Sequence, residues 1–228
     1  MRGRNLDMLE TVAEGMEDML DQVVFIGGAS ACLLIDDPVA EHVRPTEDVD
    51  CLVSLDARTE FSQLEAELRR LGFRHATEPN APICRWRYRG VQVDVMPDNA
   101  AVLGFSNAWY SEGIKHARTI ELPSGRLIRC FTLPYFAASK LEAFASRGGD
   151  FRTSHDIEDI IIVLDGQRDL AALGRGPASV VSYLKGKFGE FLGDSRFSES
   201  VHGHLPPDSS GLGRGTRILD FLHHFTQS

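Results

Sequence analysis

The sequence lacks any apolar run long enough to cross a bilayer, and its basic start at Met1-Arg2-Gly3-Arg4 is not followed by the hydrophobic core of a signal peptide. Its four cysteines are widely spaced, without a Cys-x-x-Cys pair, which disfavours a disulfide framework or a structural zinc site. An excess of positive charge is also missing, because the formal net charge is −9. We therefore expect a cytoplasmic protein with reduced thiols and no membrane partner. The charge argues against broad coating of nucleic acid and leaves a local basic surface open.

Length and composition are those of an ordinary globular protein. The 228 residues, 43% hydrophobic and 25% charged, suffice for one large domain or two small ones. Near residue 130 the pattern changes from mixed strands and helices to helices alone. We predict an α/β (α+β) domain over 1–130, with a mixed sheet and flanking helices, and a C-terminal helical domain over 131–228.

Hydrophobic periodicity predicts the individual elements. The pair Arg89-Gly90 is typical of a tight hairpin turn, and the Gly/Ser/Pro-rich stretch 206–215 is typical of a flexible loop. Strands are expected at 22–26, 48–55, 83–88, 91–96, 119–122 and 126–130. Helices are expected at 9–20, 29–35, 59–71, 134–146, 154–164, 170–173, 178–189 and 217–225.

The most informative residues are Asp48 and Asp50. Side chains two positions apart in a strand project from the same face, so these two carboxylates are expected side by side. Two carboxylates about 4 Å apart repel by a few kcal/mol at the effective dielectric of a protein surface. Oxygen ligands of this kind suit Mg²⁺, which completes its shell with substrate phosphates. The pair therefore predicts a site for phosphoryl-group chemistry.

Two further features accompany the pair. In the strand at 91–96, alternation places the valines on the buried face and Asp94 on the opposite face, toward a cleft. Gly27-Gly28 ends the first apolar strand. Without a side chain at Gly28, a triphosphate can approach backbone N–H groups at the start of a helix, where the dipole also favours anions.

This ordered set resembles the nucleotidyltransferase superfamily, whose signature is a glycine pair after a strand, two acidic residues one apart, and a third acidic residue on a later strand. More closely, it resembles the AbiEii/AbiGii toxin branch, the nucleotidyltransferase toxins of type IV-like toxin–antitoxin systems. The resemblance spans most of the chain from Phe25 to about Gln167. Four blocks carry it: Arg44-Pro45-Thr46-x-Asp48-Val49-Asp50, Val93-Asp94-Val95-Met96-Pro97, Lys140-Leu141-Glu142-Ala143-Phe144-x-x-Arg147-Gly148 and Ser154-His155-Asp156-x-Glu158-Asp159-Ile160.

The resemblance implies a nucleotidyltransferase-type fold and a metal-dependent enzyme that moves a nucleoside monophosphate from an NTP, such as ATP or CTP, to an acceptor. Mg²⁺ or Mn²⁺ would be held by Asp48, Asp50 and Asp94, with Asp94 completing the site for the attacking hydroxyl. It also gives functional weight to Lys140 and Asp156, while their individual roles are our inference. Lys140 would meet triphosphate oxygens, Arg147 would add bidentate contacts, and Asp156 would orient Lys140 or the acceptor. The implied acceptor is RNA, best guessed as tRNA, and the implied protein partner is an antitoxin.

Two departures from the family pattern stand out. The segment between Gly28 and Asp48 is longer than in the commoner forms of the motif, so an enlarged loop is expected at 36–43. Gly28 also stands where many relatives carry serine, which removes one hydroxyl contact to phosphate. Neither departure removes a metal ligand.

Other interpretations of the same residues stay open. The acceptor can instead be a small molecule, as in antibiotic-modifying nucleotidyltransferases, since an acidic protein suits a cationic drug. A non-catalytic nucleotide-binding module is the third alternative. The strand at 83–88 alternates arginines with aromatics, which fits either an RNA-stacking surface or, as we prefer, one wet and one dry face.

Overall fold

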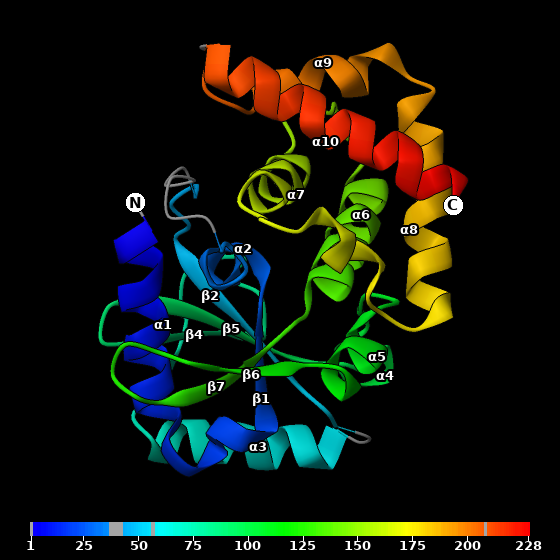
Figure 1. Cartoon of the computed structure of the whole chain (residues 1–228). Coiled ribbons are helices and arrows are strands. Elements are labelled where there is room, and N and C mark those ends of the chain that lie inside the picture. Colours follow the sequence, from blue (N-terminus) through cyan, green and yellow to red (C-terminus); the bar gives the residue numbers. More distant parts are fainter. Residues whose placement is uncertain (1, 37–42, 56–57, 208) are drawn as a thin grey trace. The chain divides into compact units, whose positions relative to one another are not determined.

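The computed structural model describes residues 2–36, 43–55, 58–207 and 209–228. The chain forms two compact units (Figure 1). The first, the sheet unit, is built from the chain up to Leu33 and from Arg44–Thr132. The second, the helical unit, is built from Leu133–Ser228 together with the segment that begins at Leu34. Most of the loop expected at 36–43 lies outside the described residues.

The sheet unit contains a seven-stranded mixed sheet with the strand order β3-β4-β5-β2-β1-β7-β6. Strand β1 runs antiparallel to the central strand β2 and parallel to β7, and β2 runs parallel to β5. The hairpins β4–β5 and β6–β7 extend the sheet outward. The strands are β1 (Val23–Ile26), β2 (Asp48–Val53), β3 (Arg74–His75), β4 (Arg85–Tyr88), β5 (Val91–Pro97), β6 (Arg118–Glu121) and β7 (Leu127–Cys130). The fold class predicted from the sequence, mixed α/β with flanking helices, is confirmed.

The core of the sheet unit lies around β1, β2 and β5. All four residues of β1 are buried, and the valine face of β5 is buried as its alternation predicts, with Val93 and Val95 fully covered. Helix α1 (Arg2–Met16) packs on β2, β4 and β5 and is followed by the 3-10 turn η1 (Glu17–Gln22). The remaining helices of this unit are α2 (Gly27–Ser30), η2 (Ala31–Leu33), α3 (Arg58–Arg70), α4 (Ala100–Leu103) and α5 (Tyr110–Lys115).

The helical unit packs its helices around an aromatic cluster. The rings of Phe144, Phe151, Phe191 and Phe197 lie with neighbouring centroids 4.9–5.7 Å apart, which is contact range for aromatic pairs. The helices are α6 (Leu133–Arg147), α7 (His155–Asp165), η3 (Leu170–Gly174), α8 (Ala178–Leu192), α9 (Ser195–Gly203) and α10 (Ser209–Gln227). In the part of the chain that the structure describes, no helix is both long and apolar enough to cross a membrane.

The glycine-rich stretch is where the sequence prediction was wrong. We expected a flexible loop through Gly215, but α10 begins at Ser209 and contains all three glycines of the stretch. Glycine weakens a helix by about 1 kcal/mol relative to alanine, so its presence needs a packing reason. A Cβ at Gly211 would lie 1.9 Å from the carbonyl oxygen of Pro206, and one at Gly215 would lie 2.4 Å from Nδ1 of His202. At these two positions the helix passes too close to its neighbours for a side chain, whereas a Cβ at Gly213 would meet nothing within 4 Å.

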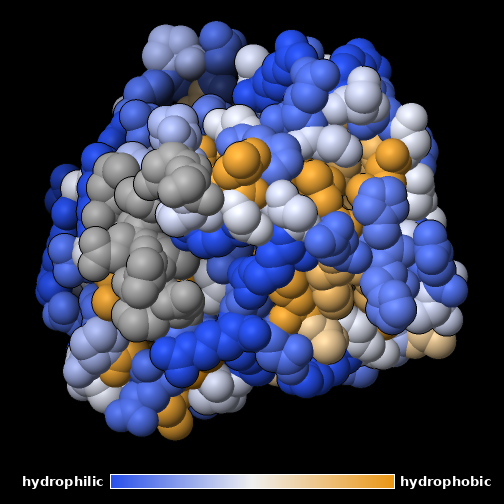
Figure 2. Space-filling view, turned by 45° about the horizontal axis from the view of Figure 1, so that its top comes forward, coloured by the Kyte–Doolittle hydropathy of each residue, from blue (hydrophilic) through white to orange (hydrophobic). Residues whose placement is uncertain are grey.

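Smaller differences concern element lengths. The helix expected at 29–35 is two short pieces, α2 and η2, and the glycine pair lies inside α2. The short elements β3, α4 and α5 and the helix α9 have no counterpart in the prediction. The molecular face drawn in Figure 2 is largely hydrophilic, in keeping with the charged share of the sequence. Among described residues, the exposed large hydrophobic side chains are Ile83, Phe105, Leu127 and Leu212.

Candidate functional site

Three carboxylates meet on one face of the sheet. Asp48 and Asp50 lie on β2, and Asp94 lies on the adjacent parallel strand β5, where it is paired in register with Asp50. One carboxylate oxygen from each residue lies within 4.8 Å of those of the other two. We call these three residues the acidic triad. The period of two that predicted a shared face for Asp48 and Asp50 is confirmed, and the parallel pairing brings Asp94 to them.

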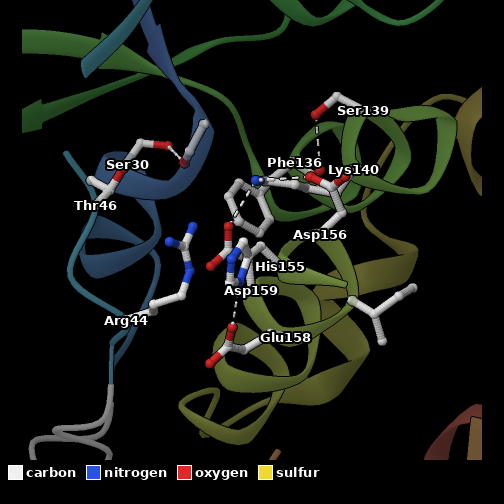
Figure 3. Close-up of polar contacts among 12 residues, drawn as sticks. Ser30, Arg44, Thr46, Phe136, Ser139, Lys140, His155, Asp156, Glu158 and Asp159 are labelled. Atoms are coloured by element: carbon white, nitrogen blue, oxygen red, sulfur yellow. Dashed lines mark hydrogen bonds and ion pairs between the residues drawn. The ribbon is translucent and has the colours of Figure 1, made fainter. Parts of the chain in front are cut away.

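Gly27 leaves the space that Asp50 occupies. Strand β1 ends at Ile26, which is paired with Asp50, so the next residue passes directly beside the carboxylate. A Cβ at Gly27 would lie 1.9 Å from Oδ2 of Asp50, and its φ of +71° lies in the left-handed region that favours glycine. Ser30 Oγ donates to the Gly27 carbonyl at 2.9 Å and fixes the turn (Figure 3). The close approach of backbone to carboxylate thus falls at Gly27, while Gly28 is a buried residue of α2.

Asp48 is held by polar neighbours on both of its oxygens. Thr46 Oγ1 donates to Oδ1 at 2.8 Å, and Gln92 Nε2 donates to Oδ2 at 3.4 Å. Thr46 is itself anchored, because its backbone N–H donates to Oδ1 of the fully buried Asn5 at 3.3 Å. Asn5 Nδ2 in turn donates to the Arg44 carbonyl at 3.0 Å. Helix α1 therefore fixes the segment that leads into β2.

Arg85 forms a bidentate ion pair with Asp94. Its Nε donates to Oδ1 at 2.8 Å and its Nη2 donates to Oδ2 at 2.7 Å. The same Nη2 lies 3.8 Å from Oδ2 of Asp48. This bond to Asp94 is the main reason why the pKa of Arg85 rises above its ordinary value, so the guanidinium stays charged.

The chemistry of the donors fits a hard divalent cation such as Mg²⁺ or Mn²⁺. All three members of the triad offer carboxylate oxygens. The thiol of Cys51 is not a competing soft ligand, because burial, reinforced by the charges of Asp50 and Asp94, raises its pKa well above the ordinary value. Burial and Asp94 likewise raise the pKa of Cys84 to about 11. The triad is thus a set of oxygen ligands beside protonated thiols.

A second charged cluster lies in the helical unit, and we call it the α6–α7 cluster: Lys140, Arg147, Asp156 and Asp159. Lys140 Nζ donates to Oδ1 of Asp156 at 3.2 Å and to Oδ2 of Asp159 at 2.7 Å (Figure 3). Arg147 Nη1 donates to Oδ2 of Asp156 at 2.7 Å. The two cations lie two turns apart on α6 and the two carboxylates lie one turn apart on α7, so each pair shares a helix face.

Burial differs sharply within the α6–α7 cluster. The side chains of Asp156 and Asp159 are 5% and 3% exposed and that of Lys140 is 13% exposed, whereas that of Arg147 is 71% exposed. Asp156 lies in the first turn of α7, behind the N-cap Ser154, whose side chain accepts from the Ile157 N–H. A carboxylate in this position is also favoured by the helix dipole.

The predicted site residues therefore fall into two groups. Asp48, Asp50, Asp94 and the glycine pair meet in the sheet unit, and Lys140, Arg147 and Asp156 meet in the helical unit. Sequence reasoning missed the partners of the triad, above all Arg85. The signal was available, because the hairpin turn pairs Tyr88 with Val91 and so places Arg85 opposite Asp94.

The strand β4 has one dry side and one wet side, the alternative that we preferred. Trp86 is completely buried and lies against the tilted ring of His75 at a centroid distance of 4.1 Å, so it offers no surface for a base. Arg85 is paired with Asp94, and Arg87 with Glu78. The RNA-stacking interpretation of this strand is therefore wrong for Trp86.

Two solved structures are similar to this chain. An antigenic nucleotidyltransferase-like protein from Paracoccidioides brasiliensis superposes with a TM-score of 0.51 and 16% identity, over 88% of this chain and 93% of that chain. The antibiotic-resistance factor ANT(2'')-Ia gives a TM-score of 0.46 and 14% identity, over 83% of this chain and 96% of that chain. No protein-family model matches the sequence, and the comparison with curated proteins gives no match. The first likeness shows that the chain has the fold of a nucleotidyltransferase-like protein.

Proposed function

We propose that this chain is a metal-dependent nucleotidyltransferase that moves a nucleoside monophosphate from an NTP to an acceptor hydroxyl and releases pyrophosphate. The acidic triad is the observation that carries the proposal. Three carboxylates within 4.8 Å of one another on adjacent strands are costly to hold together without a cation. Their place in a fold similar to that of a nucleotidyltransferase-like protein adds support.

Each residue of the sheet unit has a role in this chemistry. Asp48 and Asp50 would bind Mg²⁺ or Mn²⁺, and Asp94 would complete the ligand set beside the acceptor hydroxyl. The bound ion would make that hydroxyl more nucleophilic and steady the pyrophosphate leaving group. Gly27 and Gly28 would let phosphates approach the backbone, although α2 is only four residues long and its dipole is correspondingly small.

The helical domain, for which we propose the limits 131–228, would complete the nucleotide site. Arg147 suits a phosphate contact, because its guanidinium is largely exposed while one nitrogen holds Asp156. Lys140 would act mainly through the α6–α7 cluster, since its bonds to Asp156 and Asp159 orient it. Asp156 would then be the residue that positions both cations.

RNA, and tRNA in particular, is the acceptor that the sequence resemblance implies, with the protein acting as the toxin of a toxin–antitoxin pair. A small cationic acceptor is the second candidate. It is favoured by the net charge of −9 and by the ion pairing of the β4 arginines with Asp94 and Glu78. The two candidates share the donor chemistry and differ only in the acceptor.

Label transfer tests the proposal directly. The protein is incubated with each α-labelled NTP and Mg²⁺, in parallel with total RNA, purified tRNA and a panel of aminoglycosides. We expect label on one acceptor class, dependent on the metal and lost in Asp50→Asn. Transfer to no acceptor, combined with Mg²⁺-independent NTP binding in calorimetry, would indicate a non-catalytic binding module and overturn the proposal. Co-expression with neighbouring gene products then tests for an antitoxin.

A further inference from the structure

Arg85 occupies the acidic triad in a way that the proposed metal chemistry does not use. Its guanidinium bonds to both oxygens of Asp94, at 2.8 and 2.7 Å, and reaches to 3.8 Å from Oδ2 of Asp48. The guanidinium therefore binds Asp94 and lies close to Asp48, two of the three carboxylates of the acidic triad. Its side chain is 25% exposed, so solvent lies on its outer side.

The position of Arg85 follows from the sheet and is not a loose surface contact. Arg85 and Asp94 are paired in register on the antiparallel strands β4 and β5, and side chains at paired positions share a face. Trp86, the next residue, is completely buried and holds β4 in place. The backbone of Arg85 is thus fixed, while its long side chain can still turn toward solvent.

A guanidinium and a divalent cation compete for the same carboxylate. The fork of an arginine uses both oxygens of the group that it binds, and it cannot release its charge by losing a proton. Metal ligation at either oxygen of Asp94 would place two positive centres around one carboxylate that is only 10% exposed, where screening by water is weak. The contact of Arg85 with Asp48 adds a second point of overlap.

We propose that Arg85 is the resting counter-ion of the acidic triad and that it leaves Asp94 when a divalent cation binds, so that Arg85 sets the affinity of the site for metal. The inference rests on the proposed function only in taking the triad to be the metal site. Arg85 is thus a positioning residue. It holds Asp94 and Asp48 in place while no cation is bound, and it makes the site a weak binder of free metal.

The test is calorimetric titration of the full chain with Mn²⁺ in the absence of nucleotide. We expect Arg85→Gln to bind Mn²⁺ on the order of tenfold more tightly than the wild type, because one close positive charge is removed. Arg85→Lys keeps the charge without the fork and is expected to fall between the two. Arg87→Gln is the matched control, since Arg87 lies two residues further on the same strand and pairs with Glu78 instead. It should leave the Mn²⁺ affinity unchanged.

Thermal unfolding gives a second readout that does not depend on activity. Without metal, Arg85→Gln should unfold at a lower temperature than the wild type, because the triad has lost its counter-ion. Added Mn²⁺ should raise its unfolding temperature more than that of the wild type. Should Arg85→Gln fail to fold, Arg85→Lys carries the same comparison.

The outcomes separate this inference from the proposed function. Equal or weaker Mn²⁺ binding by both Arg85 variants, with binding still abolished in Asp50→Asn, overturns the role of Arg85 alone. Mn²⁺ binding that survives in Asp50→Asn shows that the triad is not the metal site and overturns both. Tighter binding in Arg85→Gln, with no transfer to any acceptor, supports the counter-ion role and counts against the enzyme.

Discussion

The acidic triad and the α6–α7 cluster both contain aspartates, but they differ in how many positively charged side chains bind those aspartates. The triad brings three carboxylates together, and among the ion pairs described above Arg85 is the cation that contacts two of them. In the α6–α7 cluster the ion pairs described above join two aspartates to two cations. The carboxylates of the α6–α7 cluster are also the more deeply buried, at 5% and 3% exposure, against 30% for Asp48 and 10% for Asp94.

On the proposed function, the triad is a site that binds a cation, whereas the buried ion pairs of the α6–α7 cluster also support the fold. A buried and balanced cluster loses stability when any member is removed, because the remaining charge is left unpaired in a poorly solvated place. An unbalanced and partly exposed cluster stores repulsion, which an external cation relieves. The two clusters should therefore respond to substitution with opposite effects on stability.

Removing one member of the triad is the strongest test of the comparison. Asp50→Asn keeps the shape of the side chain and removes one ligand, so we expect nucleotidyl transfer to fall by about three orders of magnitude, or about 4 kcal/mol of barrier. The free energy of unfolding without metal should stay level or rise, because repulsion within the triad is reduced. Transfer assays and urea unfolding on the same preparation check both statements. A loss of stability together with the loss of activity would put the triad in the same class as the α6–α7 cluster.

Removing Lys140 should have the opposite signature. Lys140→Met removes the cation that binds both Asp156 and Asp159, and we expect unfolding to become easier by about 3–5 kcal/mol. Lys187→Met is the matched control, because Lys187 is paired with Glu190 three residues on along the surface of α8. Its loss should cost no more than about 0.5 kcal/mol. Equal effects of the two substitutions in urea unfolding would show that the α6–α7 cluster does not support the fold.

Gly27 tests how tightly the backbone holds the triad. Gly27→Ala places a Cβ 1.9 Å from Oδ2 of Asp50 and also strains a φ of +71°, so we expect a loss of about 2–3 kcal/mol and weaker Mn²⁺ binding. Gly90→Ala separates the two causes. Gly90 has a φ of +86° but open space where a Cβ would lie, so only the strain of about 1 kcal/mol should appear there. Equal losses would mean that Asp50 moves aside without penalty.

The parts of this molecule that could be predicted from the sequence are those governed by short-range rules. The period of two placed Asp48 and Asp50 on one face, and the valine alternation placed Asp94 opposite the core. The helix expected from 154 was also placed correctly, and in the structure Ser154 is the N-cap of α7. Several strand and helix positions followed from hydrophobic periodicity to within a few residues, but α1 begins at Arg2 where a start at 9 was expected, and α10 begins at Ser209 where a start at 217 was expected.

What could not be predicted depends on contacts between segments far apart in the chain. Propensity favours a loop at Gly211–Gly215, and the closeness of Pro206 and His202, which accounts for glycine at 211 and 215, is visible only in the folded chain. The bond between Asn5 and the segment before β2 joins residues some forty positions apart and has no local signature.

The thiol of Cys84 reports on the charge of the triad, and it is expected to show the smallest effect. Burial, followed by the charge of Asp94, raises its pKa from 9.0 to about 11. The unfolded chain therefore releases the Cys84 proton at a lower pH than the folded chain. The stability that the folded chain gains from the raised Cys84 pKa is complete below pH 9 and is lost as the pH rises toward 11. The free energy of unfolding of the wild type should fall by about 1–2 kcal/mol more than that of Cys84→Ala between pH 8 and pH 10.5 in urea unfolding.

Asp94→Asn should lower the Cys84 pKa, measured by thiolate absorbance, both because a negative charge is lost and because Arg85 keeps its positive charge. An unchanged thiol pKa would mean that Arg85 already neutralises the triad, which would bring its charge balance close to that of the α6–α7 cluster.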